Sequence, residues 1–283
     1  MPRRQQATAR QERLGAELRK LREAAGLRGR EAAALLGTDS AQVSQIEAGL
    51  AGVSEARLRR IAAHYACTDL ELIDALATMA ADRTHGWWEE YRGLLPTSFL
   101  DLSELEHYAS YRWDVEFLHV PGLLQTEEYA RALFSSRVPE LPNEDMELRV
   151  QHRMQRRSII EKEPPVPYEA LIHEAALRMR VGGRAASRTQ LGRVLEHSEQ
   201  DHITVRVIPF ELENFADLGS AMVYAGGTVS KLDTVVRDGP HGTVFIDSEA
   251  QLTVFRTHFR RVEAVSLNAE RSRDFIHRLS KEV

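Results

Sequence analysis

The chain has 283 residues, 43% of them hydrophobic and 28% charged, which is the balance of a folded protein of about two domains. No run approaches the ~20 apolar residues that span a bilayer, and no apolar segment follows the basic N-terminus as in a secretory signal. The net charge of −5 argues against a non-specific nucleic-acid binder, and the single cysteine, Cys67, excludes an internal disulfide and fits a cytoplasmic protein.

Charge is distributed unevenly along the chain. Residues 1–30 hold nine basic side chains, including Arg3 and Arg4, and only three acidic ones, although the whole chain is acidic. A basic segment on an acidic protein is typical of a DNA-binding domain joined to a domain with another role. On charge alone, a solvated charged tail remains the alternative.

Residues 11 to about 80 predict five short helices. Leu14, Leu18 and Leu21 recur on one helical face, and glycines end the first three helical patterns. Because the connections between these helices span only a few residues, we expect a compact all-α domain at residues 1–80.

Three segments of this domain resemble the lambda-repressor-like helix-turn-helix domains of the XRE family: LRKLREAAGL (18–27), EAAALLG (31–37) and QVSQIEAG (42–49). The second and third helices are joined by a tight turn at 37–39, which sets them at a steep angle. The resemblance implies that the third helix lies in the major groove, with its N-terminal side chains facing base edges.

The residues expected to contact bases lie in this third helix: Ser40, Ala41, Gln42, Ser44 and Gln45. A glutamine side chain makes bidentate contacts with adenine, and an alanine methyl contacts the thymine methyl. Ser44 is also suited to a phosphate contact. Val43 and Ile46 are expected to face inward and hold the helix in place.

Two further roles follow from the resemblance. Arg22 of the first helix and Glu47 of the third are expected to form a structural bridge. The family often carries a glutamine at the start of the second helix as a phosphate clamp, whereas this chain has Gly29, so Arg28 and Arg30 are the expected phosphate contacts. The alternative is a small helical domain used for protein binding, with its DNA surface lost.

Residues 81–163 predict an aromatic-rich, mostly helical connector with a role in dimerisation. Six aromatic residues are candidates for a ligand or peptide pocket: Trp87, Trp88, Tyr91, Tyr108, Tyr111 and Trp113. Tyr108 and Tyr111 are expected on one helix face. The alternative is that these residues pack an interdomain helix against the core or against a second copy of the chain.

A charged helix is expected at 143–162, bounded by prolines. Four of its arginines share one face: Arg149, Arg153, Arg156 and Arg157. We interpret them as a solvated face, and a site for an acidic partner is the alternative.

From residue 164 the pattern predicts an α/β or α+β domain that extends to residue 283. Five segments rich in β-branched and aromatic residues are strand candidates: 168–172, 203–208, 221–224, 234–237 and 244–246. The last two flank the turn sequence DGPHG and predict a hairpin. Helices are expected at 187–198, 248–262 and 268–281.

Segments of the remainder resemble the DUF5753-type domain that follows the helix-turn-helix domain in many actinobacterial regulators of the XRE family. They include VPGLLQTEEYARALF (120–134), RMQRR (153–157), LIHEAALRMRVGG (171–183), QLGRVLEHS (190–198) and ITVRVIPF (203–210). The resemblance covers most of residues 81–283. It implies transcriptional regulation, often with a small partner protein encoded nearby, in an arrangement compared to antitoxin and toxin.

No motif of an enzyme, a metal site or a cofactor site is complete. His173 and Glu174 would begin the zinc-protease motif H-E-x-x-H, but Leu177 stands where its second histidine belongs. The segment AGGTVSKL (225–232) lacks the spacing of a phosphate-binding loop. We therefore expect a protein that is not an enzyme and that has no metal and no cofactor.

The sequence as a whole predicts a sequence-specific DNA-binding transcriptional regulator. We expect it to bind double-stranded operator DNA as a homodimer, since two half-sites multiply specificity. Its C-terminal domain would sense a small-molecule effector or a partner protein. The alternative is an antitoxin-like interaction protein that neutralises a small partner by direct binding.

Overall fold

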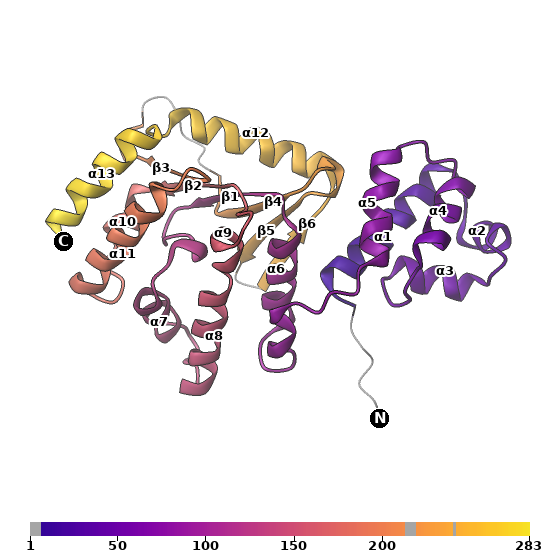
Figure 1. Cartoon of the computed structure of the whole chain (residues 1–283), viewed down its shortest axis with the longest axis horizontal. Helices are drawn as coiled ribbons and strands as arrows, with labels where there is room; N and C mark the ends of the chain where they lie inside the picture. Colours follow the sequence, from indigo (N-terminus) through magenta and orange to yellow (C-terminus); the bar gives the residue numbers. More distant parts are fainter. Residues whose placement is uncertain (1–6, 213–218, 240–241) are drawn as a thin grey trace. The chain divides into compact units, whose positions relative to one another are not determined.

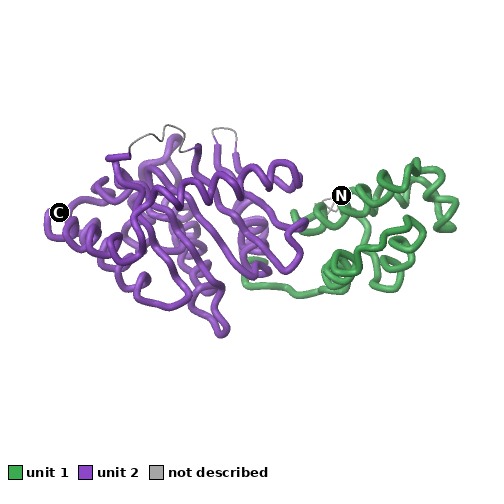
Figure 2. The backbone as a smooth tube through the Cα atoms, turned by 90° about the horizontal axis from the view of Figure 1, so that it is seen from above, with its two compact units in different colours: residues 1–89 green, residues 90–283 purple. Residues whose placement is uncertain are grey.

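The computed structural model describes residues 7–212, 219–239 and 242–283. The chain forms two compact units, Met1–Glu89 and Glu90–Val283, which Figure 2 distinguishes by colour. The first unit is helical, and the second is built on a six-stranded sheet with helices packed on it. The predicted order of an all-α domain followed by an α/β domain is therefore confirmed.

The described part of the first unit contains five α-helices. They are α1 (Ala9–Ala24), α2 (Gly29–Leu35), α3 (Ser40–Glu47), α4 (Glu55–His64) and α5 (Leu70–Ala81). Asp39, Ser54 and Asp69 each precede a helix, and each side chain accepts a hydrogen bond from a backbone N–H of the first turn. Arg3 and Arg4 of the basic segment lie outside the described residues.

The core of the first unit is apolar and draws on all five helices. Its buried side chains include Leu18, Ala33, Val43, Ile46, Leu58, Ile61 and Leu76. Where α1 meets α3, a Cβ on Gly15 would lie 2.6 Å from the carbonyl oxygen of Glu47. Only glycine allows this close approach, so the contact fixes α3 against α1.

The second unit alternates helices and strands. A 3₁₀-helix, η1 (Trp87–Tyr91), spans the junction between the units. In chain order there follow α6 (Thr97–Tyr108), β1 (Tyr111–Glu116), η2 (Gly122–Leu124), α7 (Glu127–Ser135), α8 (Asn143–Gln155), α9 (Ser158–Glu161), β2 (Tyr168–His173), α10 (Glu174–Arg178), α11 (Arg184–Ser198), β3 (Ile203–Ile208), β4 (Met222–Gly226), η3 (Ser230–Leu232), β5 (Thr234–Gly239), β6 (Gly242–Ile246), α12 (Glu249–Val265) and α13 (Ala269–Glu282).

The sheet has the strand order β3-β2-β1-β4-β5-β6. Strands β1, β2 and β3 run parallel, whereas the pairs β1–β4, β4–β5 and β5–β6 are antiparallel. The five predicted strands correspond to β2 through β6, and β5 with β6 forms the predicted hairpin. Pro240 and His241 of its turn lie outside the described residues.

Within the predicted connector at 81–163, which was expected to be mostly helical, residues 111–116 are not helical. These residues form β1, which lies between β2 and β4 in the middle of the sheet. The charged side chains of Arg112 and Asp114 in β1 are buried. In the sequence alone, charged residues at these positions indicate an exposed segment, because the residues that pair with them in the fold are not apparent. This part of the chain therefore contributes a strand to the sheet of the second unit.

Helices cover both faces of the sheet (Figure 1). On one face lies α12, with Phe259 stacked on Trp113 at a ring-centroid distance of 4.7 Å. The core on the other face includes residues of α9, α10, α11 and α13. Because successive side chains of a strand point to opposite faces, Arg112, Asp114 and Glu116 point away from α12 and toward this second helical layer.

Candidate functional site

The exposed side of α3 is the first candidate surface. Val43 and Ile46 face the core as predicted, with 3% and 4% of their surface exposed. The predicted base-contacting residues occupy the outer side: Ser40, Ala41, Ser44 and Gln45 are exposed, and Gln42 is partly exposed. The Asp39 carboxylate accepts a hydrogen bond of 2.7 Å from the backbone N–H of Gln42, which fixes the first turn of the helix.

A bidentate ion pair joins α3 to α1. Arg22 donates from Nε and Nη2 to the two carboxylate oxygens of Glu47, at 2.6 Å and 3.0 Å. Its Nη1 also donates to the carbonyl oxygen of Leu27, at 2.7 Å. Hydrogen bonding to Glu47 raises the pKa of Arg22. The bridge that the family resemblance implied is present, and its geometry suits orientation of the helix and not base reading.

The predicted phosphate contacts stand at the start of α2. Arg28 and Arg30 are exposed, and among the described residues neither side chain forms an ion pair. The backbone N–H of Arg28 donates to the carboxylate of Glu31 at 2.6 Å, so the helix start is fixed while both guanidinium groups remain accessible. Two accessible cations beside the α2–α3 pair suit contacts with a phosphate backbone.

The six aromatic pocket candidates come from both units. Trp87 and Trp88 contact each other edge to face, with ring centroids 6.1 Å apart, and belong to the first unit. Tyr91 belongs to the second unit, where its hydroxyl donates to the side-chain carbonyl of Gln155 at 2.7 Å.

The prediction that Tyr108 and Tyr111 share a helix face is wrong, because Tyr108 ends α6 whereas Tyr111 begins β1. Tyr111 and Trp113 both pack against Tyr224 of β4, with ring centroids 6.2 Å and 4.9 Å apart. The Tyr111 hydroxyl also donates to the buried carboxylate of Asp233, at 3.0 Å. Tyr111 and Trp113 therefore lie on a strand and pack against neighbouring residues of the second unit.

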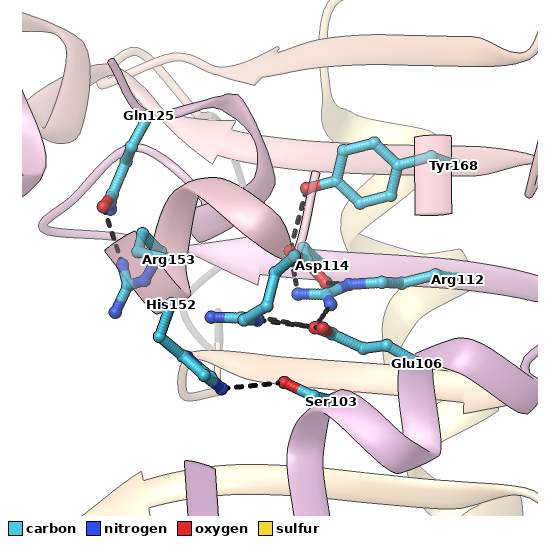
Figure 3. A network of polar contacts seen from close by, with 9 residues as sticks. Ser103, Glu106, Arg112, Asp114, Gln125, His152, Arg153 and Tyr168 are labelled. Carbon is cyan, nitrogen blue, oxygen red and sulfur yellow. Dashed lines mark hydrogen bonds and ion pairs between the residues drawn. The ribbon is translucent and has the colours of Figure 1, made fainter. Parts of the chain in front are cut away.

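A cluster of charged side chains lies buried between β1, α6 and α8 (Figure 3). Glu106, Arg112 and Asp114 are each at most 1% exposed. Arg112 donates to both oxygens of Asp114, at 2.7 Å and 2.9 Å, and also to Glu106. Arg156 donates twice to Glu106, at 2.8 Å and 2.6 Å, and Tyr168 donates to Asp114 at 2.8 Å. Two guanidinium groups thus balance two carboxylates, as buried charges require.

The solvated-face interpretation of the four arginines is wrong for Arg156, which is buried, whereas Arg149, Arg153 and Arg157 are each partly exposed. Arg153 near the end of α8 and Arg156 directly after it lie on the side of the charged residues of β1 and α6. His152 lies beside them, with Nε2 3.0 Å from the Ser103 hydroxyl (Figure 3). Burial, assisted by the charges of Arg156 and Arg153, lowers the pKa of His152 to about 3, so its ring is neutral at pH 7.

Arg153 has a different environment from the paired arginines. Its Nη1 donates to the side-chain carbonyl of Gln125 at 2.6 Å, while the amide nitrogen of Gln125 donates to the carbonyl oxygen of Val120 at 2.7 Å. Burial, and then the charge of Arg156, lower the pKa of Arg153 to about 9. Burial, and then the charge of Asp114, raise the pKa of nearby Glu116 to about 8.

Glu106, Arg112 and Asp114 are not among the site residues predicted from the sequence. The available signal was the alternation in YRWDVE, in which charged residues occupy every second position of a short β-rich segment. For a metal, the described part of the chain offers no group of three or more His, Cys, Asp or Glu side chains suitably placed.

Comparisons with known proteins agree with both units. A family model described as a domain of unknown function, DUF5753, matches residues 99–278, and one described as a helix-turn-helix domain matches residues 13–76. No curated protein and no solved structure matches the chain. Among the described helices, none has the length and apolar character needed to cross a membrane.

Proposed function

Because the chain belongs to the DUF5753 family and carries a helix-turn-helix domain ahead of that region, we propose that it is a transcriptional regulator that binds operator DNA through α3. The observation that carries the proposal is the division of α3 into two sides. Val43 and Ile46 hold the helix in the core, while polar side chains cover its outer side. A recognition helix needs this arrangement, since its outer side chains reach base edges in the major groove.

Gln42 and Gln45 are the proposed determinants of sequence. Each carries a donor and an acceptor that match the adenine edge, and each such contact contributes about 1–3 kcal/mol of discrimination. Ala41 contacts a thymine methyl, and Ser40 and Ser44 complete the polar surface. The Arg22–Glu47 bridge supports this readout by holding the C-terminal end of α3.

Arg28 and Arg30 are the proposed phosphate contacts. Contacts of this kind set the register of a protein on the duplex without reading its sequence. They also make the affinity fall with salt concentration, because each contact releases a condensed counterion.

The proposal extends to control of the DNA-binding domain. The DUF5753 region senses a small-molecule effector or a partner protein, and the chain acts in the cytoplasm as a homodimer on two half-sites. A ligand controls DNA affinity only if it binds the DNA-competent state and the other state with different strength. No catalytic step belongs to this proposal.

Fluorescence anisotropy tests the DNA-binding role. The wild-type protein is titrated into labelled duplexes from the region upstream of its own gene and into a scrambled duplex of the same composition. The double variant Gln42→Ala/Gln45→Ala removes the proposed base contacts. The variant Gln251→Ala is the matched control, because it truncates an exposed glutamine of α12 in the other unit.

Selective binding that is lost in the double variant and retained in the control is the expected result. Equal, weak and steeply salt-dependent binding to every duplex, unchanged in the double variant, would overturn the proposal, because it reflects counterion release alone. In that case the antitoxin-like interaction protein, which neutralises a small partner by direct binding, becomes the better hypothesis.

A further inference from the structure

Arg153 differs from the other two arginines of the buried cluster in its charge balance. Arg112 and Arg156 donate to the carboxylates of Asp114 and Glu106. In the described ranges, Arg153 has no carboxylate within ion-pair distance, and its hydrogen bond goes to the neutral amide oxygen of Gln125. A partly buried cation without a counterion is costly, and an anionic ligand removes that cost.

The guanidinium groups of Arg153 and Arg156 both lie against Gly122. A Cβ on Gly122 would lie 3.3 Å from Nη1 of Arg153 and 3.4 Å from Nη1 of Arg156. Two cationic groups therefore converge beside a residue that has no side chain. The ring of Phe134 packs on the flat face of the Arg153 guanidinium group, with its centroid 5.1 Å away. Hydrogen bonds from this group can therefore form only in the plane of its N–H donors.

The other charged groups near Arg153 do not neutralise it at pH 7. With a pKa of about 8, Glu116 is mostly protonated at this pH and offers a hydrogen-bond donor to an anion. Asp238 of β5 is exposed, bonds to the Thr243 hydroxyl at 2.7 Å and acts on Arg153 only at longer range. Arg153 itself, with a pKa of about 9, stays charged.

Glu116, the last residue of β1, lies close enough to Arg153 for the two groups to interact electrostatically.

We propose that Arg153, assisted by Arg156 and Glu116, forms a binding site for a small molecule that carries an oxyanion, either a carboxylate or a phosphate group. The planar guanidinium fork of Arg153 matches two oxygens of such a group. Gln125 holds the fork in place, and Arg156 adds a second positive charge. The role of this site as the effector site of the regulator rests on the proposed function, whereas anion binding itself does not.

The experiment uses the full-length protein at pH 7 and constant ionic strength. Thermal unfolding and isothermal titration calorimetry are recorded with inorganic phosphate and with succinate, against chloride as the reference anion. Binding at tenfold excess over Kd raises the unfolding temperature by roughly 2–4 °C. Stronger stabilisation by phosphate points to a phosphate-bearing ligand, and stronger stabilisation by succinate points to a carboxylate-bearing ligand.

Two variants locate the site. Arg153→Met keeps much of the apolar stem but removes the charge, and we expect it to weaken anion binding at least tenfold. Arg131→Met is the matched control, because Arg131 of α7 is already paired with Glu127 and Glu147 and is not available to an anion. We expect the control to bind like the wild type.

If neither phosphate nor succinate raises the unfolding temperature of the wild-type protein above its value in chloride, the proposed site is overturned, whatever the variants show. Unchanged affinity in Arg153→Met, with the fold verified by circular dichroism, also overturns it. DNA affinity is measured in parallel, with and without each anion. If the anions bind but DNA affinity does not change, the site is supported and effector control through it fails. If no duplex is bound, the proposed function fails while calorimetry still decides the site.

Discussion

Arg22 of α1 and Glu47 of α3 are joined by two hydrogen bonds, 2.6 Å and 3.0 Å long, although they lie 25 residues apart in the sequence. Their side chains are only 10% and 12% exposed. Solvent therefore screens the pair weakly, and the fork geometry restricts the orientation of α3. The helix proposed to read DNA is thus fastened at its C-terminal end, while Asp39 fixes its first turn.

Loss of this bridge is expected to reduce both stability and DNA affinity. Glu47→Ala leaves Arg22 charged and largely buried, which costs about 2–4 kcal/mol of unfolding free energy. Urea denaturation measures the loss, and anisotropy measures the affinity. Glu23→Ala is the control, because Glu23 is 53% exposed and its loss costs below about 1 kcal/mol. Equal effects of the two substitutions would contradict the structural role of the bridge.

The proposed phosphate contact of Arg30 is tested by salt dependence. Arg30→Ala is expected to weaken binding to all duplexes by a similar factor and to reduce the slope of log K against log salt concentration by about 1. Arg261→Ala, in the exposed part of α12, is the control for loss of one positive charge. An unchanged slope for Arg30→Ala would show that Arg30 does not contact a DNA phosphate.

The variant Gly15→Ala tests the close approach of α1 to α3. A Cβ at this position would lie 2.6 Å and 2.7 Å from the carbonyl oxygens of Glu47 and Ile46, so Gly15→Ala forces the helices apart and costs about 1–3 kcal/mol. Gly192 is the matched helical control, because a Cβ there meets nothing within 4 Å. Gly192→Ala is expected to be neutral or to stabilise by up to about 1 kcal/mol. Thermal unfolding of the two variants compares them, and equal unfolding temperatures would argue against the tight contact.

Glu116 is expected to make stability depend on pH. Burial and the charge of Asp114 raise its pKa from 4.5 to about 8, so the folded chain binds a proton that the unfolded chain releases. This contribution is complete below pH 4.5 and is lost as the pH rises through 8. The expected loss between pH 5 and 8 is about 1–2 kcal/mol, below the ~1.4 kcal/mol per pH unit of a fully buried group, because Glu116 is only half-buried.

Glu116→Gln removes the titrating group while preserving its shape. Urea denaturation of the variant at several pH values is expected to show a flatter dependence between pH 5 and 8 than the wild-type protein. Arg153 and Asp238 act on the same carboxyl group and are unchanged in the variant. Identical pH profiles for the two proteins would show that the pKa of Glu116 is close to its ordinary value.

The helix-turn-helix domain could be predicted from the sequence because its signals are local. Helical periodicity, the N-cap Asp39 and the glycines that end helices all act within a few residues, and they gave five helices with Val43 and Ile46 inward. The strands β2 through β6 were predicted for the same reason, since β-branched residues fill them and turn residues separate them. The pairing of Arg22 with Glu47 came from the family resemblance and not from any local signal.

The sequence by itself therefore determined the two-domain order, the all-α fold of the first domain and most strands of the second. Only the tertiary structure decided that residues 111–116 form the central strand β1 and that Arg153 and Arg156 point inward. Charged side chains are normally solvated, so an isolated pattern places them at the surface. Arg153 and Arg156 become stable inside only when Gln125 and Glu106, which lie 28 and 50 residues away in the chain, come within hydrogen-bond distance. That condition depends on the assembled fold, because no local stretch of the chain contains both partners.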